Sequence, residues 1–214
     1  MWNIISGSNY VGKTTTIEIL KKNYKSFLFF SHPRFNDAQH YSFNYNVANT
    51  MFNKSNIDDV TIHIPRDVIY QLSHMTCLKY LITVKDKKII SDRSFICEMV
   101  YNELYSKPIY HEFINILKTN FQYKIFLLTV NDDKALEKRI IERLKNDATK
   151  GYGIRDSKGF VPEPATVEDK MKSQRAIESK YKQFISQFEL DCVEIDTSDK
   201  TKREVANIIA NWKE

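Results

Sequence analysis

Eight consecutive residues near the N-terminus have the types and the spacing that bind a phosphate group. They follow the pattern G-x-x-x-x-G-K-[ST] and read Gly7, Ser8, Asn9, Tyr10, Val11, Gly12, Lys13 and Thr14, with Thr15 directly after them. In a loop of this kind, successive backbone N–H groups and the positive end of the following helix hold a β-phosphate. Lys13 can reach the β- and γ-phosphates, and the hydroxyl of Thr14 is available to Mg²⁺. This phosphate-binding loop therefore predicts ATP and Mg²⁺ as cofactors.

Apolar residues in the chain alternate between short runs and longer amphipathic stretches. The short runs predict strands at residues 2–6, 26–30, 88–91, 123–130 and 192–195. The amphipathic stretches predict helices at residues 13–22, 39–52, 66–84, 94–105, 108–119 and 133–146, from Thr166 onward, and at 200–213. Because the strands are apolar throughout, we expect a parallel sheet covered on both faces. The predicted fold class is α/β, a three-layer α/β/α sandwich with a five-stranded parallel sheet.

The composition favours a globular protein and argues against several other classes. The 214 residues are enough for one well-buried core, so we expect a single domain over residues 1–214. The net charge of +5, from 32 basic and 27 acidic residues, is too modest for a nucleic-acid-binding stripe. Three widely spaced cysteines, and no two histidines four residues apart, predict neither a disulfide framework nor a zinc site. No signal peptide or membrane span is recognisable, which favours the cytoplasm.

Two further segments argue against a GTPase. A GTPase needs a DxxG motif, but Asp92 is followed by Arg-Ser-Phe with no glycine. The segment Asn131-Asp-Asp-Lys134 follows a predicted strand, but its order does not match the NKxD motif that reads guanine. We interpret residues 131–134 as the N-cap region of the next helix.

A pair of charged residues ends the third predicted strand. The run from Ile89 to Phe95 reads Ile-Ile-Ser-Asp-Arg-Ser-Phe. The carboxylate of Asp92 can lie near Mg²⁺, and Arg93 beside it can grip an acceptor phosphate with two hydrogen bonds. Together with the phosphate-binding loop, this pair resembles the thymidylate kinase and deoxynucleoside kinase group, which has the P-loop kinase fold. The resemblance implies catalytic roles for Lys13, Asp92 and Arg93, with Thr14 and Asp92 as metal ligands.

The run from Asp92 to Tyr101 looks similar to phage-encoded thymidylate-kinase-like proteins. The chain departs from the group inside the phosphate-binding loop. Thymidylate kinases usually have an acid where Asn9 stands and a glycine where Tyr10 stands. These differences bear on the acceptor base more than on the phosphoryl-transfer chemistry.

Three more residues are candidates for binding the acceptor beside Arg93. Arg34 follows the second predicted strand, in the loop that lines the acceptor site of thymidylate kinases. An arginine in solvent is an equally open interpretation. Tyr70 and Gln71 lie on the helix predicted at residues 66–84, where the group recognises its base. They offer a stacking ring and an amide, or alternatively a core aromatic residue beside an exposed glutamine.

Arg139 and Arg143 are four residues apart, which places them on one face of a predicted helix. A predicted loop at residues 147–164 follows, and it contains three of the five glycines of the chain. This arrangement resembles the arginine-bearing lid of nucleotide kinases, here at about residues 136–165. Such a lid closes over ATP, excludes water and neutralises charge on the transferred group. A solvated basic helix face is the alternative.

The resemblance implies an ATP-dependent kinase for a small-molecule nucleotide acceptor, with no membrane or nucleic-acid partner. The leading hypothesis is transfer of the γ-phosphoryl group to a (deoxy)nucleoside monophosphate, thymidylate kinase-like. The alternatives are a deoxynucleoside kinase, or a P-loop ATP-binding protein that acts on polynucleotide ends or in regulation. A homodimer is expected because many members of the group dimerise. The acceptor base, the sugar and the choice between nucleoside and monophosphate stay open.

Overall fold

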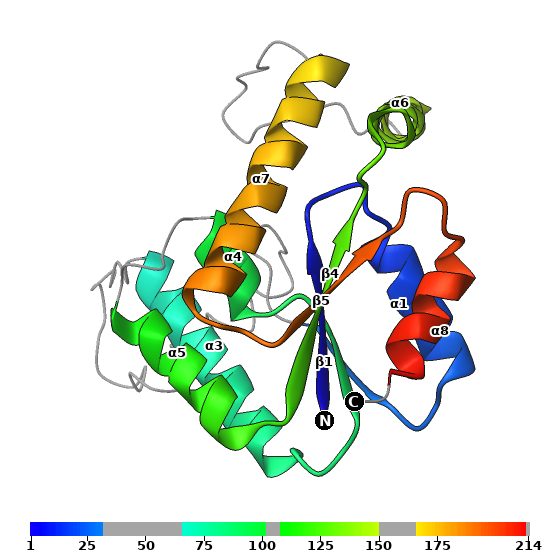
Figure 1. Ribbon diagram of the computed structural model, residues 1–214. Coiled ribbons are helices and arrows are strands. Elements are labelled where there is room, and N and C mark those ends of the chain that lie inside the picture. Colours follow the sequence, from blue (N-terminus) through cyan, green and yellow to red (C-terminus); the bar gives the residue numbers. More distant parts are fainter. Residues whose placement is uncertain (32–65, 102–107, 150–165, 213–214) are drawn as a thin grey trace, which may run out of the picture.

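The computed structural model describes residues 1–31, 66–101, 108–149 and 166–212, which form five strands and seven helices (Figure 1). The strands are β1 (Trp2–Gly7), β2 (Leu28–Ser31), β3 (Ile89–Asp92), β4 (Tyr123–Thr129) and β5 (Cys192–Asp196). The helices are α1 (Lys13–Asn23), α3 (Arg66–Thr83), α4 (Phe95–Tyr101), α5 (Pro108–Asn120), α6 (Asp133–Thr149), α7 (Val167–Gln187) and α8 (Lys202–Ala210). The short helix predicted at residues 39–52 lies outside the described residues. Across these ranges no helix is both long and apolar enough for a membrane crossing.

The five strands form one parallel sheet in the order β2-β3-β1-β4-β5. Strand β1 lies at the centre, and all six of its residues are buried. Its register pairs Ile5 with Asp92 of β3 and Gly7 with Leu128 of β4. The carboxyl ends of these three strands therefore meet at one edge of the sheet, where ligands of open parallel sheets bind.

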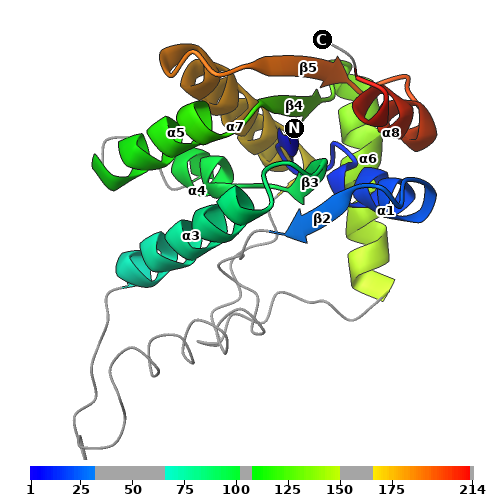
Figure 2. The same cartoon turned by 90° about the horizontal axis from the view of Figure 1, so that it is seen from below.

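Different helices cover the two faces of the sheet. Successive strand residues point to opposite faces, so Ile4 packs in the core with α3, α4, α5 and α7, whereas Ile5 packs with α1, α6 and α8. Figure 1 shows α1 and α8 side by side on one face and α3, α4 and α5 on the other, and Figure 2 shows the same layers from below. The predicted three-layer sandwich is confirmed.

Local capping residues set where two of the helices begin. The hydroxyl of Thr166 accepts a hydrogen bond from the Asp169 amide, and the Asp169 carboxylate accepts one from the Thr166 amide. This confirms the helix start predicted at Thr166. Thr201 and Glu204 form the same capping box, so α8 begins at Lys202, two residues later than predicted.

Other predicted boundaries also differ from the structure. The strand predicted at residues 26–30 is β2, which begins at Leu28 because the Leu28 amide pairs with the Lys88 carbonyl and Ser26 lies in a turn. The helix predicted at residues 94–105 is α4, which begins at Phe95, and its predicted end lies outside the described residues. The loop predicted from residue 147 begins too early, since α6 continues to Thr149, before the first glycine of that segment.

The three cysteines are free thiols, as the sequence predicted. Cys97 is buried in the core. Burial raises the pKa of the Cys77 thiol, and likewise that of Cys192, to about 11. Thiols with pKa values this high stay protonated at neutral pH and are poor nucleophiles. Catalytic chemistry at these two cysteines is therefore disfavoured.

Candidate active site

The phosphate-binding loop connects the end of β1 to the start of α1, as predicted. Its two glycines have positive φ angles, +135° at Gly7 and +90° at Gly12. Glycine adopts this region at little cost, whereas other residues are strained there. Helix α1 has no acidic residue in its first turn and two lysines in its last turn. The positive end of its dipole therefore stays available to an anion at the loop.

The side chain of Lys13 lies inside this loop. It is 6% exposed. Its Nζ atom donates hydrogen bonds to the carbonyl oxygens of Gly7, at 2.9 Å, and of Ser8. The ammonium group is thus fixed at the concave side of the loop, next to the N-terminus of α1. A cation shielded from water in this way attracts phosphate more strongly than an exposed lysine.

A cleft of about 870 Å³ opens over the phosphate-binding loop. Its walls are the loop with the first turn of α1, the end of β3, one face of α6, and the segment from the end of β5 into α8. The residues that line it are Asn9, Tyr10, Val11, Gly12, Lys13, Thr14, Thr15, Thr16, Arg93, Arg139, Glu142, Arg143, Asn146, Thr197, Lys200, Thr201, Lys202 and Val205. Six of these residues are cationic and one is acidic, so the cleft is suited to a polyanion of nucleotide size.

Backbone strain is concentrated at this cleft. In the described ranges, three residues other than glycine have positive φ angles: Tyr10 at +64°, Arg93 at +67° and Glu189 at +47°. The first two line the cleft. Non-glycine residues in this region are uncommon and are enriched at functional sites. Tyr10 adopts a conformation that glycine would adopt without strain.

Arg93 reaches the cleft from the end of β3. Its amide donates to the Ile5 carbonyl at 3.1 Å, and its guanidinium carbon lies 5.8 Å from the centre of the Tyr101 ring. Burial lowers the pKa of Arg93, but the surrounding groups, Cys97 foremost, raise it above its ordinary value. A charged guanidinium held over an aromatic ring is well placed to contact a second anion. Asp92 beside it is buried and is absent from the cleft lining.

Arg139 braces α6 against the rest of the site. Its Nη1 atom donates to Thr197 Oγ1 at 2.8 Å and to the Tyr10 carbonyl at 3.5 Å, and its Nη2 atom donates to the Thr197 carbonyl. The Thr197 hydroxyl in turn donates to the Thr129 carbonyl at 2.8 Å. Burial lowers the pKa of Arg139 despite the nearby carboxylates, although an arginine remains charged at neutral pH. Arg139 therefore joins α6, the phosphate-binding loop and the sheet.

Arg143 lies one turn further along α6, and it is exposed and lines the cleft. Glu142 and Asn146 line the same wall. Their spacing of three and seven residues from Arg139 puts them on its helix face. The structure thus brings the two predicted lid arginines to the cleft, on the part of the lid that it describes, residues 136–149.

The predicted acceptor residues are less well placed. Arg34 lies outside the described residues, and the same holds for the side chain of Tyr70. Gln71 is half-buried on α3 and is absent from the cleft lining. Of the four candidates, Arg93 alone can be placed at the cleft in the described part of the chain. The roles of the other three stay predictions.

Sequence reasoning missed the wall that follows β5. Thr197, Lys200, Thr201 and Lys202 line the cleft, yet they carry no recognisable motif. A usable signal was present: they directly follow the predicted strand at residues 192–195, and parallel strands deliver ligand-binding residues at their carboxyl ends.

The oxygen donors near the loop are compatible with Mg²⁺. The hydroxyl-bearing Thr14 is exposed in the cleft, and Asp92 ends the neighbouring strand β3. In the described ranges no three His, Cys, Asp or Glu side chains form a metal-binding cluster. Mg²⁺ prefers few protein ligands together with water and phosphate oxygens, so the Thr14 hydroxyl fits this ion, whereas Asp92 stays a predicted ligand.

The fold is similar to those of solved nucleotide-binding proteins. YorR from Bacillus subtilis, in complex with phosphorylated GDP, superposes with a TM-score of 0.56 at 14% sequence identity, over 98% of this chain and 94% of that chain. The deoxyadenosine kinase of M. mycoides with bound dATP gives a TM-score of 0.50 at 18% identity, over 99% and 98%. No protein-family model and no curated protein sequence matches the chain. At these identities the likeness shows the fold alone, which is that of P-loop kinases.

Proposed function

We propose that this protein is an ATP-dependent kinase that transfers the γ-phosphoryl group to a (deoxy)nucleoside monophosphate. The observation that carries the proposal is the distribution of cations around one cleft. Lys13 and the N-terminus of α1 lie at its floor, Arg93 reaches it from β3, and Arg143 reaches it from α6. Phosphoryl transfer between two anions needs cations on both reactants, because there is little other chemistry for the protein to perform.

The reaction assigns a task to each element. The phosphate-binding loop holds the β-phosphate, and Lys13 contacts the β- and γ-phosphates. Thr14 and Asp92 would hold Mg²⁺, which would supply further neutralisation of phosphate charge. Arg93 holds the acceptor phosphate, one oxygen of which attacks the γ-phosphorus. The bond from the γ-phosphorus to the bridging oxygen breaks, and ADP leaves with the electron pair.

The test is ADP release from ATP and Mg²⁺ with a panel of acceptors at equal concentrations. The panel holds ribo- and deoxynucleosides and their monophosphates. Nucleosides are included because a deoxyadenosine kinase shares this fold. Turnover with one monophosphate above its nucleoside supports the proposal and identifies the base. Turnover with nucleosides alone would replace it by the deoxynucleoside kinase alternative, and ATP binding without turnover would point to a polynucleotide or regulatory role.

The two arginines of α6 are expected to have different roles. Arg139 is engaged with Thr197 and the Tyr10 carbonyl, whereas Arg143 is exposed to the cleft. We expect Arg143→Met to lower kcat about 10²-fold, as for loss of one cation at the transferring group, with little change in Tm. Arg139→Met should mainly raise KM for ATP and lower Tm, because it disconnects α6 from the loop. Steady-state kinetics and thermal unfolding measure both.

Lys145→Met serves as the control for both variants. Lys145 is an exposed cation on the same helix but is absent from the cleft lining. It should leave kcat, KM and Tm unchanged. Equal kinetic and stability changes in Arg139→Met and Arg143→Met would contradict the division of roles.

A further inference from the structure

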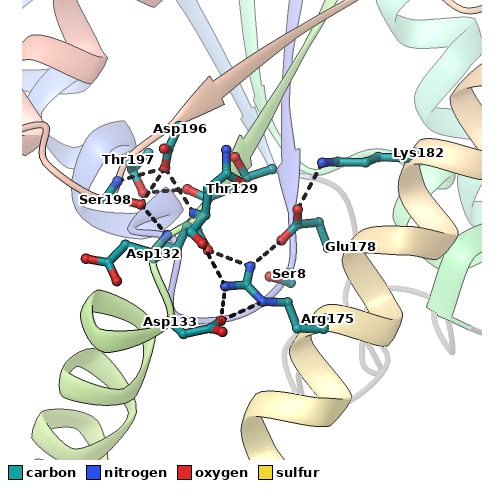
Figure 3. Close-up of polar contacts among 12 residues, drawn as sticks. Ser8, Thr129, Asp132, Asp133, Arg175, Glu178, Lys182, Asp196, Thr197 and Ser198 are labelled. Carbon is teal, nitrogen blue, oxygen red and sulfur yellow. Dashed lines mark hydrogen bonds and ion pairs between the residues drawn. The ribbon is translucent and has the colours of Figure 1, made fainter.

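The connection between β4 and α6, residues 130–132, and the first residue of α6 are held from one side by Arg175 of α7 (Figure 3). Arg175 Nη1 donates to the Val130 carbonyl at 2.6 Å and to Glu178 Oε2 at 3.2 Å. Its Nη2 donates to the Asn131 carbonyl at 3.2 Å and to Asp133 Oδ1 at 2.5 Å, and its Nε donates to the same oxygen at 3.1 Å. Each of the five N–H groups of the guanidinium thus has an acceptor.

The opposite side of the connection is held by the last residue of β5, Asp196, and by Ser198, which follows the strand. The Asn131 amide donates to Asp196 Oδ1 at 3.1 Å, and the Asp132 amide donates to Ser198 Oγ at 3.0 Å. Ser198 is itself fixed, because its hydroxyl donates to Asp196 Oδ1 at 2.6 Å. The carbonyl groups of Val130 and Asn131 therefore face Arg175, and the amide groups of Asn131 and Asp132 face Asp196 and Ser198, the neighbours of Thr197 in the cleft wall.

A chain of ion pairs along α7 holds Arg175 in place. Glu178, with a side chain only 11% exposed, accepts from Arg175 and also pairs with Lys182 at 3.1 Å. Lys182 also forms an ion pair with Glu194 of β5, at 2.9 Å. Figure 3 shows the guanidinium lying between α7 and the start of α6. This network ties the connection to a helix that is packed on the sheet through Tyr181 and does not line the cleft.

We propose that Arg175 is a positioning residue of the phosphoryl-transfer site, acting through the start of α6; this inference rests on the proposed function. Arg143 lies ten residues after Asp133, about 15 Å along the helix axis. A tilt of about 10° at the connection would move Arg143 by about 3 Å, and a misplacement of about 1 Å can reduce a rate 10²-fold. The backbone contacts of Arg175 restrict this tilt.

The contacts of Arg175 differ in burial and therefore in expected strength. This difference allows an experiment to separate the carbonyl contacts from the ion pair. The Asp133 side chain is 72% exposed, so its ion pair with Arg175 contributes little. The bond to the Val130 carbonyl is partly buried and charge-assisted. If the carbonyl contacts carry the effect, removing Asp133 matters far less than removing Arg175. A lysine at this position would keep the charge but could not reproduce the planar arrangement of donors.

The experiment compares Arg175→Met, Arg175→Lys and Asp133→Asn, with Lys172→Met as the control on the exposed side of α7, where the Lys172 side chain is 72% exposed. Hydrogen exchange without nucleotide is the first readout. We expect amides of the connection and the first turns of α6 to exchange about 10-fold faster in both Arg175 variants, with β1 and α1 unchanged. Asp133→Asn and Lys172→Met should match the wild type.

Kinetics form the second readout. Both Arg175 variants should lower kcat about 10-fold or more through misplaced Arg143, while KM for the acceptor changes little. Unchanged exchange in α6 would overturn the inference, as would an Asp133→Asn variant as impaired as Arg175→Met. A wild-type chain without any turnover would reject the proposed function, and the exchange data would still decide whether Arg175 holds α6. If Arg175→Met does not fold, Arg175→Lys carries the same comparison.

Discussion

Exchange of Lys13 for alanine is expected to lower kcat for phosphoryl transfer from ATP about 10²–10³-fold while the fold is retained. The Lys13 ammonium is shielded from water and bonded to the carbonyls of the phosphate-binding loop. Its charge therefore acts on a nearby phosphate with little screening. Negative charge moves onto the bridging oxygen and the β-phosphate as the bond to the leaving group breaks, so the loss falls on the transition state.

Stability should change little in this variant. The carbonyls of Gly7 and Ser8 lose one donor each, but truncation of Lys13, which lines the cleft, leaves space through which water can replace it. We expect Tm to fall by less than about 5 °C. Lys22→Ala is the matched control, because Lys22 lies on the same helix and is exposed. Near-normal turnover in Lys13→Ala would reject the assignment of the cleft as a kinase site.

Exchange of Gly7 for alanine is expected to destabilise the protein by about 2–6 kcal/mol, from backbone strain and overpacking together. The φ angle of Gly7 is +135°, and a Cβ atom there would lie 2.4 Å from the Leu128 carbonyl oxygen. Neither atom can move away easily, because Gly7 and Leu128 are paired in the register of β1 and β4. We expect Tm to fall by about 10 °C or more, measured by circular dichroism.

Gly12→Ala separates the two causes. The φ angle of Gly12 is also positive, at +90°, but a Cβ atom there would have no neighbour within 4 Å. Only backbone strain remains, with an expected cost of about 1–3 kcal/mol. Gly7→Ala should therefore unfold at a clearly lower temperature than Gly12→Ala. Equal Tm values for the two variants would show that the close contact with the Leu128 carbonyl oxygen adds nothing to the destabilisation.

The phosphate-binding loop could be predicted because its chemistry lies in one continuous segment. The glycines, Lys13 and Thr14 are placed by the local path of the chain between a buried strand and a helix. The alternation of strands and helices could be predicted equally well, since the spacing of apolar residues is a local property of the sequence. Helix starts at capping boxes such as Thr166 were predictable for the same reason.

Boundaries that depend on a partner could not be predicted from local pattern. Strand β2 begins at Leu28 rather than Ser26, because its pairing with β3 decides which residues are in the sheet. The strand order is likewise a matter of tertiary contacts, which place β1 between β3 and β4. Gln71 does not line the described cleft, and its predicted role in reading the base stays a prediction.

Residues close together in the chain were enough to predict a glycine-rich loop of the phosphate-binding type, an α/β sandwich and a pair of arginines on one helix face. The tertiary structure alone decided how these parts meet. Arg139 contacts Thr197 across 58 residues and Tyr10 across 129, and Arg175 holds Val130 across 45. Such contacts depend on packing around the sheet rather than on local conformational preference. No periodicity or short motif encodes them.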